Sequence, residues 1–240
     1  MLDFLCVGAQ KAGTSWLHFQ LKSIPFVCFP HGKEVHYWDW VERGKRPKDP
    51  GWYSEKFNEN SDLLCGDMTP CYALLSSDSI KEIHQLYPKV KIIYIIRNPI
   101  DRAWSGLKMG VSIMRMEPHE VSRQGMHDVL HSASSIERGN HLKVIKKWVS
   151  VFGKDQVLVK NYEEIVSDKV GFLTDVYNFL DIDLKHLDSI DKGLLNRQVN
   201  KGMDMPMPDD IRQELCGLYE NMIRDLEVYL KKDFEHWCKK

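Results

Sequence analysis

The sequence has 240 residues, of which 43% are hydrophobic and 28% are charged, as expected of one soluble globular domain with a substantial core. Its formal net charge of -1 argues against a general nucleic-acid binder, because such proteins carry a basic footprint. No run approaches the roughly 18–20 apolar residues that cross a bilayer, and the N-terminus shows no secretory signal, so we expect a cytoplasmic protein without a membrane partner.

Four short apolar runs have the character of β-strands, and each is followed by a polar or glycine-containing turn and then by a helix-like stretch. The strands are expected at Phe4–Val7, Leu63–Cys65, Lys91–Ile96 and Gln156–Lys160. The helices are expected at about residues 14–23, 78–87, 99–110, 138–152, 168–180 and 209–230. This alternation predicts the α/β class, with a central, mainly parallel β-sheet flanked by helices in a single domain over residues 1–240.

Two stretches fit neither pattern. Residues 41–54 are a polar loop rich in Pro and Gly, and residues 112–135 mix Met, His, Ser and charged residues without a convincing period. Long loops inside compact domains are usually functional or mobile. We expect acceptor specificity to lie in the loops around residues 36–54, 67–76 and 112–135.

The loop after the first strand, "GAQKAGTS" at residues 8–15, looks like a phosphate-binding loop whose lysine is displaced. In the nucleotide-hydrolase pattern G-x-x-x-x-G-K-[ST], the lysine follows the second glycine. Here Thr14 follows Gly13, and the only lysine is Lys11, inside the loop. The start of the next helix is a natural anion site, where Lys11 could reach a bridging or a terminal phosphate oxygen. The alternative is a glycine turn with a solvated lysine.

The strand Lys91–Ile96 ends in Arg97, Asn98 and Pro99, with no acidic residue that would help to hold Mg²⁺. An arginine at this position suits a bidentate contact with a second phosphate. We therefore expect the site to be cationic and metal-free.

The cysteines and histidines show no metal-binding spacing. The ten histidines contain no H-E-x-x-H pattern, and the six cysteines, at positions 6, 28, 65, 71, 216 and 238, contain no C-x-x-C pair. We expect reduced, mostly structural thiols, as in cytosolic proteins, and no structural metal.

A candidate base lies in "GKEVHYWD", residues 32–39. Glu34 and His36 are two positions apart, which places them on the same side of an extended segment. Either a carboxylate or an imidazole can take the proton of an attacking hydroxyl. The alternative is a solvated glutamate and a histidine that caps the core beside its aromatic neighbours.

These motifs resemble those of sulfotransferases that use 3′-phosphoadenosine-5′-phosphosulfate (PAPS). "FLCVGAQKAGTSWL" is similar to their 5′-phosphosulfate loop. "IIYIIRNPIDRAWSGLKMG" is similar to their 3′-phosphate motif, in which an Arg and a Ser eight residues later, here Arg97 and Ser105, bind the 3′-phosphate. The resemblance continues in "RGNHLKVIKKWVSVFGKDQVLVKNYEEI" and "VNKGMDMPMP" and covers nearly the whole chain. It implies a P-loop-like fold, PAPS as co-substrate, its product PAP, and no metal.

The resemblance also implies the nucleotide-binding residues. Tyr162 in "NYEE" matches a tyrosine that packs near the adenine. Asn200, Lys201 and Gly202 align with an R-K-G triplet that binds the 3′-phosphate, and because Asn200 replaces the arginine, that contact could fall to Lys201 or Arg197. The whole predicted set is Lys11, Ala12, Gly13, Thr14, Ser15, Trp16, Arg97, Ser105, Tyr162, Arg197, Asn200, Lys201 and Gly202.

On the acceptor side, "GKEVHYWD" resembles the K-E-x-H-[FY]-[FW]-D segment of the heparan-sulfate-type branch, where the Glu is taken as general base. This implies Glu34 as base, His36 orienting it or sharing the role, and Lys11 stabilising the leaving 5′-phosphate. "CGDMTPCY", residues 65–72, resembles G-E-[KIM]-[ST]-P-x-Y, with Asp67 in place of the Glu. Met68 stands where glycosaminoglycan enzymes typically have a lysine, which argues against a polyanionic acceptor.

The implied activity is transfer of a sulfuryl group from PAPS to a hydroxyl, first of a carbohydrate and second of a small metabolite. One alternative is a P-loop nucleotide kinase, which would need a lysine at position 14 and a metal-binding acid after the strand. The other is a non-catalytic nucleotide-binding adaptor, against which Glu34 and Lys11 both argue. No oligomeric state is predicted.

Overall fold

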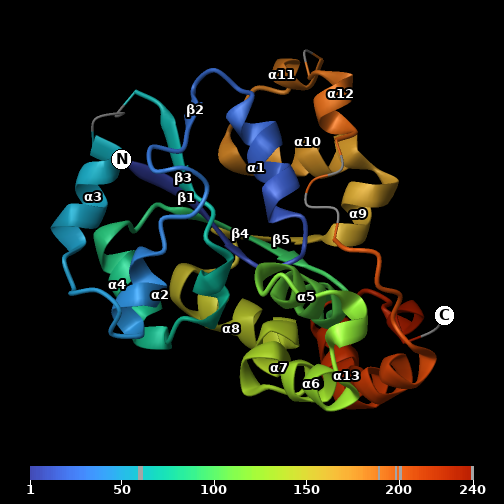
Figure 1. Ribbon diagram of the computed structural model, residues 1–240. Helices are drawn as coiled ribbons and strands as arrows, with labels where there is room; N and C mark the ends of the chain where they lie inside the picture. The colour runs from blue at the N-terminus through green and yellow to red at the C-terminus, as the bar shows by residue number, and fades with distance from the viewer. Residues whose placement is uncertain (59–61, 189, 198, 200–201, 239–240) are drawn as a thin grey trace. The chain divides into compact units, whose positions relative to one another are not determined.

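The computed structural model describes residues 1–58, 62–188, 190–197, 199 and 202–238 (Figure 1). Its contacts divide the chain into two compact units. The first unit contains Met1–Ile96 and Ile145–Val199, and the second contains Arg97–Val144 and Asn200–Lys240. A single sulfotransferase domain over residues 1–240 stays a prediction.

The first unit holds a five-stranded, all-parallel sheet with the strand order β2-β3-β1-β4-β5. Its strands are β1 (Leu2–Gly8), β2 (Val27–Cys28), β3 (Leu64–Asp67), β4 (Lys91–Ile96) and β5 (Val157–Asn161). Ile92 to Ile96 of β4 are all buried, as expected of a parallel strand covered on both faces. The predicted α/β class is confirmed, and the four predicted strands agree with the observed bounds to within two residues.

Helices cover both faces of this sheet (Figure 1). On one face α1 (Thr14–Lys22) packs against α10 (Lys169–Leu180), with the rings of Trp16 and Phe172 5.8 Å apart. On the other face α4 (Ser77–Leu86) packs against α8 (His141–Phe152), with the rings of His84 and Phe152 4.9 Å apart. The remaining helices of this unit are α2 (Tyr37–Glu42), α3 (Pro50–Asn58), η1 (Pro70–Leu74), α9 (Tyr162–Ser167), α11 (Lys185–Asp188) and α12 (Lys192–Leu195).

The second unit is helical over the residues that the structure describes. Its elements are α5 (Pro99–Ile113), η2 (Pro118–Glu120), α6 (Arg123–Leu130), α7 (Ala133–Gly139), α13 (Asp209–Leu230) and η3 (Glu235–Trp237), and the first residues of α8 also belong to it. The expectation of an irregular stretch at 112–135 is therefore wrong. The helix α6 has eight residues and buries only Leu130, so its short apolar pattern was not enough to predict it.

Two other boundaries differ from the sequence prediction. The predicted helix 138–152 is divided at Asn140 into the end of α7 and the start of α8. The predicted loop 41–54 becomes helical at Pro50, the first residue of α3. Proline is tolerated at the first position of a helix, so the proline that indicated a loop in the sequence instead begins a helix.

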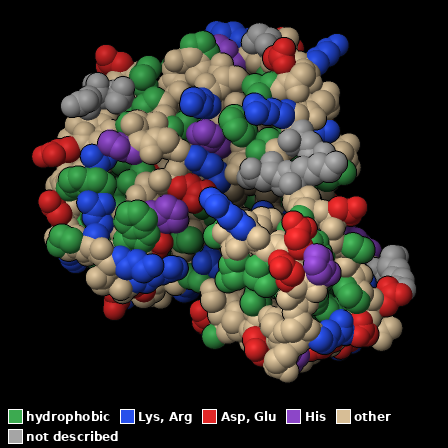
Figure 2. Space-filling view, in the orientation of Figure 1, with side chains coloured by type: hydrophobic (Ala, Val, Ile, Leu, Met, Phe, Trp, Pro, Cys, Tyr) green, Lys and Arg blue, Asp and Glu red, His purple; other side chains and the backbone are tan. Residues whose placement is uncertain are grey.

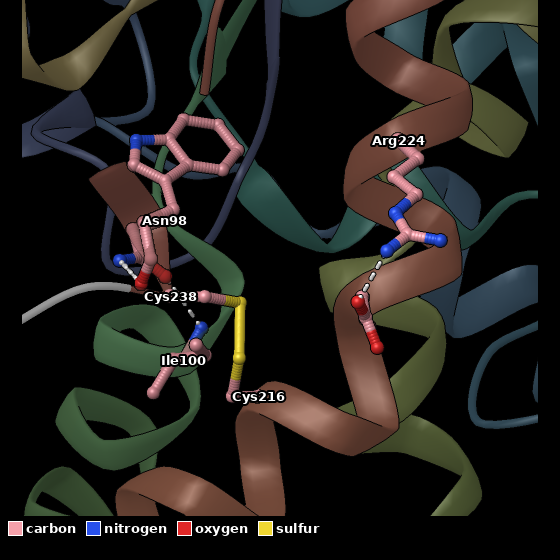
Figure 3. Close-up of a disulfide and its surroundings, with 7 residues drawn as sticks. Asn98, Ile100, Cys216, Arg224 and Cys238 are labelled. Atoms are coloured by element: carbon pink, nitrogen blue, oxygen red, sulfur yellow. Dashed lines mark hydrogen bonds and ion pairs between the residues drawn. A yellow bond between two sulfur atoms is a disulfide. The ribbon is translucent and has the colours of Figure 1, made fainter. Parts of the chain in front are cut away.

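The expectation that all six cysteines are reduced is wrong for two of them. Cys216 of α13 and Cys238, which follows η3, form a disulfide with their Cα atoms 5.4 Å apart (Figure 3). The stacked rings of Phe234 and Trp237, both buried, fold the C-terminal segment back onto its own unit. A pair 22 residues apart matches no recognised motif, and tertiary packing alone brings it together. The other four cysteines are thiols, as expected.

No helix within the described residues is both long enough and apolar enough to cross a bilayer. Acidic and basic side chains are spread over the face that Figure 2 shows, in keeping with the formal net charge of -1. The cytoplasmic location stays a prediction.

Candidate active site

The loop between β1 and α1 has the backbone that its glycines predict. Gly13 has φ 86°, a left-handed conformation that favours glycine. A Cβ at Gly13 would lie 2.7 Å from Ile165 Cδ1 and 3.1 Å from Tyr162 Cδ2. A side chain here would collide with α9, so the glycine allows close packing of the loop on this helix. Tyr162 therefore lies beside the loop, and its role at the nucleotide stays a prediction.

The start of α1 is arranged to receive an anion. Among the described residues no side chain caps the helix, and its first turn carries no acidic residue. The first N–H groups of a helix have no partner within the helix, and together with the helix dipole they favour negative charge. Lys33 Nζ donates a hydrogen bond to Thr14 Oγ1 at 3.2 Å, which brings a cation to the same helix end.

Four side chains form a continuous polar chain that begins at this helix end. Lys33 Nζ lies 2.7 Å from Glu34 Oε1, and the other oxygen of Glu34, Oε2, lies 3.0 Å from His36 Nε2. His36 Nδ1 lies 3.2 Å from both carboxylate oxygens of Asp39. Asp39 is only 3% exposed, whereas Lys33, Glu34 and His36 keep 18%, 31% and 26% of their side chains exposed. A substrate can thus approach the first three residues but not Asp39.

The hydrogen bonds of His36 restrict which of these side chains carry protons. A neutral imidazole carries a single N–H, so it can donate to only one of two carboxylates. Two arrangements make both contacts of His36 hydrogen bonds at the same time. In one, both ring nitrogens carry a proton and donate to the two carboxylates; in the other, Glu34 carries a proton and donates it to the ring. The pair formed by Glu34 and His36 therefore has a place for a proton taken from an acceptor.

A buried carboxylate holds the backbone of this segment in place. Asp67, at the end of β3, is fully buried, and its Oδ1 accepts hydrogen bonds from Thr69 Oγ1 at 2.6 Å and from Val35 N at 3.3 Å. Thr69 Oγ1 in turn accepts from the backbone N–H groups of Val35 and His36 at 3.0 and 3.3 Å. The side chains that follow β3 thus fix the backbone between Glu34 and His36.

Two tyrosines complete the surroundings of Asp67. Tyr72 OH and Tyr53 OH donate to its Oδ2 at 2.8 and 2.9 Å. Burial raises the pKa of Asp67, and the hydrogen bonds from Thr69, Tyr72 and Tyr53 lower it by less. The aspartate, predicted only as a variant of an acceptor-flanking glutamate, is inaccessible and acts by positioning the candidate base.

Next to the base lies an exposed aromatic surface. The ring of Trp40 stacks on that of His36 at 5.4 Å and an angle of 12°, and Trp40 is 41% exposed. Met68, by contrast, is fully buried, so its position presents neither a charge nor a side chain to an acceptor. The surface beside the base is therefore partly apolar.

The other predicted residues of the first unit surround α1. Ala12 and Thr14 are buried, and Lys11 and Ser15 are partly exposed. Trp16 is buried and its Nε1 donates to Leu195 O at 3.1 Å, so its indole joins α1 to α12. The Arg197 guanidinium lies 4.8 Å from the ring of Phe19, a cation–π contact that holds it beside α1.

The remaining nucleotide-binding candidates belong to the second unit. Arg97 directly precedes the cap of α5, and its carbonyl oxygen accepts a hydrogen bond from His141 Nε2 at 2.7 Å. Ser105 lies in α5, partly exposed, and a Cβ on Gly202 would lie 3.4 Å from Lys108 Cε. Asn200 and Lys201 lie outside the described residues. The binding roles of all these residues stay predictions.

Sequence reasoning missed Lys33 and Asp39 as members of the site. Both were visible in the quoted segment, because Lys33 precedes Glu34 and Asp39 stands three residues after His36. The contact of Lys33 with Thr14, 19 residues away in the chain, depends on how the strands place the two loops.

The chain is similar in sequence to known proteins. A family model described as "Sulfotransferase domain" matches residues 2–207. Heparan sulfate glucosamine 3-O-sulfotransferase 6 of Homo sapiens is 29% identical over 181 residues, which cover 73% of this chain and 51% of that protein. The 3-beta-hydroxysteroid sulfotransferase of Cavia porcellus is 27% identical over 199 residues, which cover 76% of this chain and 60% of that protein. The chain thus spans about half the length of the first of these relatives.

Solved structures show the same fold. A sulfotransferase from Alicyclobacillus acidocaldarius superposes with a TM-score of 0.74 at 23% identity, over 99% of this chain and 98% of that chain. Mouse sulfotransferase SULT7A1, solved in complex with PAP, superposes with a TM-score of 0.61 at 18% identity, over 96% of this chain and 87% of that chain. The predicted P-loop-like fold is confirmed.

Proposed function

The chain belongs to the sulfotransferase domain family, and from this membership we propose that it transfers a sulfuryl group from PAPS to the hydroxyl of an acceptor. One observation carries the proposal: the chain of contacts from Thr14 through Lys33 and Glu34 to His36. It joins a phosphate-binding helix start to a candidate base, and an in-line transfer needs donor and base close together.

The residues of the first unit fit the donor. The uncapped start of α1 would hold the 5′-phosphosulfate through the backbone N–H groups of residues 12–16, with the hydroxyls of Thr14 and Ser15. Tyr162 beside Gly13 would contact the adenine. We propose that the 3′-phosphate is bound by Arg97 and Ser105, assisted by Arg197, Asn200, Lys201 and Gly202.

The two loop lysines would stabilise charge during transfer. Lys11 lies in the middle of the loop with a left-handed backbone, φ 72°. It would face the 5′-phosphate, which gains negative charge as it leaves. Lys33, between Thr14 and Glu34, would stabilise the oxygens of the sulfuryl group as it passes to the acceptor. Two lysines supply positive charge at the point where a nucleotide kinase uses Mg²⁺, and we propose that the transfer needs no metal.

Glu34 would take the proton of the acceptor hydroxyl. Its Oε2 lies 3.0 Å from His36 Nε2, which would hold the carboxylate in place to accept this proton. Asp39, buried behind the ring, would keep the orientation of His36. His36 would thus orient Glu34, and Asp39 would in turn orient His36.

For the acceptor, we propose a carbohydrate hydroxyl, with a small-metabolite alcohol as the second choice. Heparan sulfate glucosamine 3-O-sulfotransferase 6 is one of the relatives, which supports a sugar. The exposed face of Trp40, stacked on His36, offers an apolar platform of the kind on which a sugar ring or an apolar alcohol can lie. Met68 is buried and brings no positive charge for a polyanionic chain.

The test is release of PAP from PAPS in the presence of a panel of neutral sugars, anionic sugars and small alcohols. We expect acceptor-dependent release of PAP that persists in EDTA. Magnesium-dependent cleavage of ATP would instead indicate a kinase or a hydrolase. Tight binding of PAP, without transfer to any member of the panel, would indicate an adaptor.

A further inference from the structure

A second group of titratable side chains lies in the second unit and takes no part in the proposed transfer. His127 of α6, His131 directly after that helix, and Glu214 of α13 converge on one point. Glu214 Oε1 lies 3.4 Å from His127 Nε2 and 2.6 Å from His131 Nε2. One ligand atom from each residue lies within 4.8 Å of the other two.

Local structure explains why these side chains meet. Residues four apart in a helix project from the same face, and the rings of His127 and His131 are stacked 4.1 Å apart at an angle of 13°. Ser122 caps α6 through a hydrogen bond from Gly125 N to its Oγ at 3.0 Å. An ion pair between Arg123 and Asp210 joins the starts of α6 and α13. The histidine pair therefore faces Glu214 across the contact between two helices of one unit.

We propose that His127, His131 and Glu214 bind a zinc ion. Zinc takes histidine nitrogens and carboxylate oxygens at about 2.0–2.2 Å in a tetrahedral arrangement, which separates neighbouring ligand atoms by roughly 3.4 Å. The distance between His127 Nε2 and Glu214 Oε1 already has this value, and the distance to His131 Nε2 needs to open by less than about 1 Å. The stacked rings must also turn relative to each other before both Nε2 atoms can point at one ion, and the side chains of His127 and Glu214, 52% and 39% exposed, have room for these movements.

The surroundings suit a divalent cation with one open coordination position. A pocket of about 140 Å³ is lined by two of the three ligands, His127 and Glu214, and has room for a water molecule. The carboxylates of Glu214 and Asp128 both lie beside His127, and the nearby carboxylate of Asp210 is paired with Arg123.

Asp128 would support the site from the second layer. Its Oδ1 lies 3.8 Å from His127 Nδ1, on the side of the ring away from Glu214, and accepts a hydrogen bond from Gln124 Nε2 at 2.7 Å. At 3.8 Å this contact is an ion-pair distance and not a hydrogen bond, so Asp128 contributes negative charge beside His127 and does not fix its tautomer. The ion would then join α6 to α13 and stabilise the second unit without touching the transfer site.

The experiment is a zinc titration of the metal-stripped, tag-free protein by calorimetry, with the thermal midpoint Tm as second readout. It uses a Cys71→Ser background, because Cys71, His36 and Asp39 also lie close enough together to take an ion. We expect one zinc per chain and a Tm that rises with zinc concentration. His131→Gln and Glu214→Gln should each weaken binding by about 10–100-fold or more.

His119→Gln, which changes an exposed histidine of the same unit outside the cluster, is the matched control and should bind zinc like the parent. Absence of saturable zinc binding, or equal binding by the parent and both cluster variants, would overturn the proposal. Release of PAP is measured in parallel. Because the zinc site does not depend on the proposed function, His131→Gln should leave transfer unchanged while it abolishes the zinc-dependent rise in Tm.

Discussion

At the scale of single residues, the arrangement around Glu34 separates the two proton acceptors that the sequence left open. Glu34 has one oxygen on Lys33 and the other on His36, whereas His36 lies between two carboxylates. Each ring nitrogen of His36 already contacts a carboxylate, whereas a carboxylate oxygen of Glu34 has a further lone pair that can face an acceptor hydroxyl. On these contacts we propose Glu34 as base and His36 as its orienting partner.

The first prediction tests this assignment. Glu34→Gln keeps the shape of the side chain and removes its charge, so transfer should fall by roughly 10²–10⁴-fold while the affinity for PAP is retained. His36→Ala should cost less, and the acidic limb of its pH–rate profile should persist. Single-turnover rates and PAP titrations measure the two effects. Retained activity in Glu34→Gln together with an inactive His36→Ala would reverse the two roles.

Lys33 is the residue that the structure adds to the site, and its role is the second prediction. Because its ammonium joins Thr14 to Glu34, Lys33→Met should lower the turnover number by about 10²–10³-fold and change the affinity for PAP much less. Lys89→Met, at an exposed lysine, is the control. If only the Michaelis constant for PAPS rose in Lys33→Met, the lysine would serve to bind the donor and not to stabilise the transition state.

At the scale of elements, the start of α5 determines where the backbone of Arg97 lies. Asn98 caps this helix, with its Oδ1 accepting from Ile100 N at 2.9 Å, and its Nδ2 donates to Trp237 O at 2.8 Å. His141 donates from Nε2 to the carbonyl oxygen of Arg97. Three elements of the second unit thus hold the residue that would bind the 3′-phosphate.

The third prediction is that His141 makes the free energy of unfolding depend on pH. Burial lowers the pKa of His141 to about 4, from 6.5 in the unfolded chain. The unfolded chain therefore binds this proton more readily, and the contribution of His141 to stability is fully present above pH 6.5 and is lost as the pH falls toward 4. Between pH 7 and pH 4.5 the loss should be about 2–3 kcal/mol.

Urea denaturation of the parent and of His141→Gln at both pH values measures this effect. The stability advantage of the parent over the variant should shrink by that amount as the pH falls, because the variant lacks the titrating group. His119→Gln, at an exposed histidine, should keep the pH dependence of the parent. The same pH dependence in the parent and in His141→Gln would contradict the prediction.

The elements differ in how far the sequence alone could predict them. The strand Lys91–Ile96 was predicted to the residue because a continuous apolar run is what a doubly covered parallel strand requires. The strand β2 was missed because it has only two residues, too few for any period to appear. The helix α6 was missed because capping by Ser122 and ion pairs stabilise it, whereas only Leu130 is buried.

The residues of the candidate site also differ in how far the sequence alone could predict their roles. The roles of Lys11 and Glu34 could be proposed from short local motifs, because a loop or an extended segment carries its chemistry within a few residues. The supporting role of Asp67 could not, since its partners Val35 and Tyr53 are 32 and 14 residues away in the chain. Such contacts depend on the order of the strands, which no local pattern contains.

At the scale of the whole molecule, a covalent bond reinforces the second unit. The disulfide between Cys216 and Cys238 joins α13 to the C-terminal segment, next to Trp237, whose carbonyl oxygen accepts from Asn98 (Figure 3). The bond thus attaches to α13 the segment that contacts Asn98, the residue that caps α5. Disulfides persist in oxidising compartments and are rare in the cytosol, so the stability of this unit depends on where the protein resides.

The last prediction is that this bond contributes measurably to stability. Closing a loop of 22 residues should stabilise the folded state by about 3 kcal/mol, mainly because it restricts the unfolded chain. For a chain of this size, Cys216→Ala with Cys238→Ala should then lower Tm by roughly 6–12 °C. Dithiothreitol should lower the Tm of the parent by a similar amount and have no further effect on the double variant. An equal response of both proteins to dithiothreitol would contradict the prediction, because the double variant has no bond between these positions to reduce.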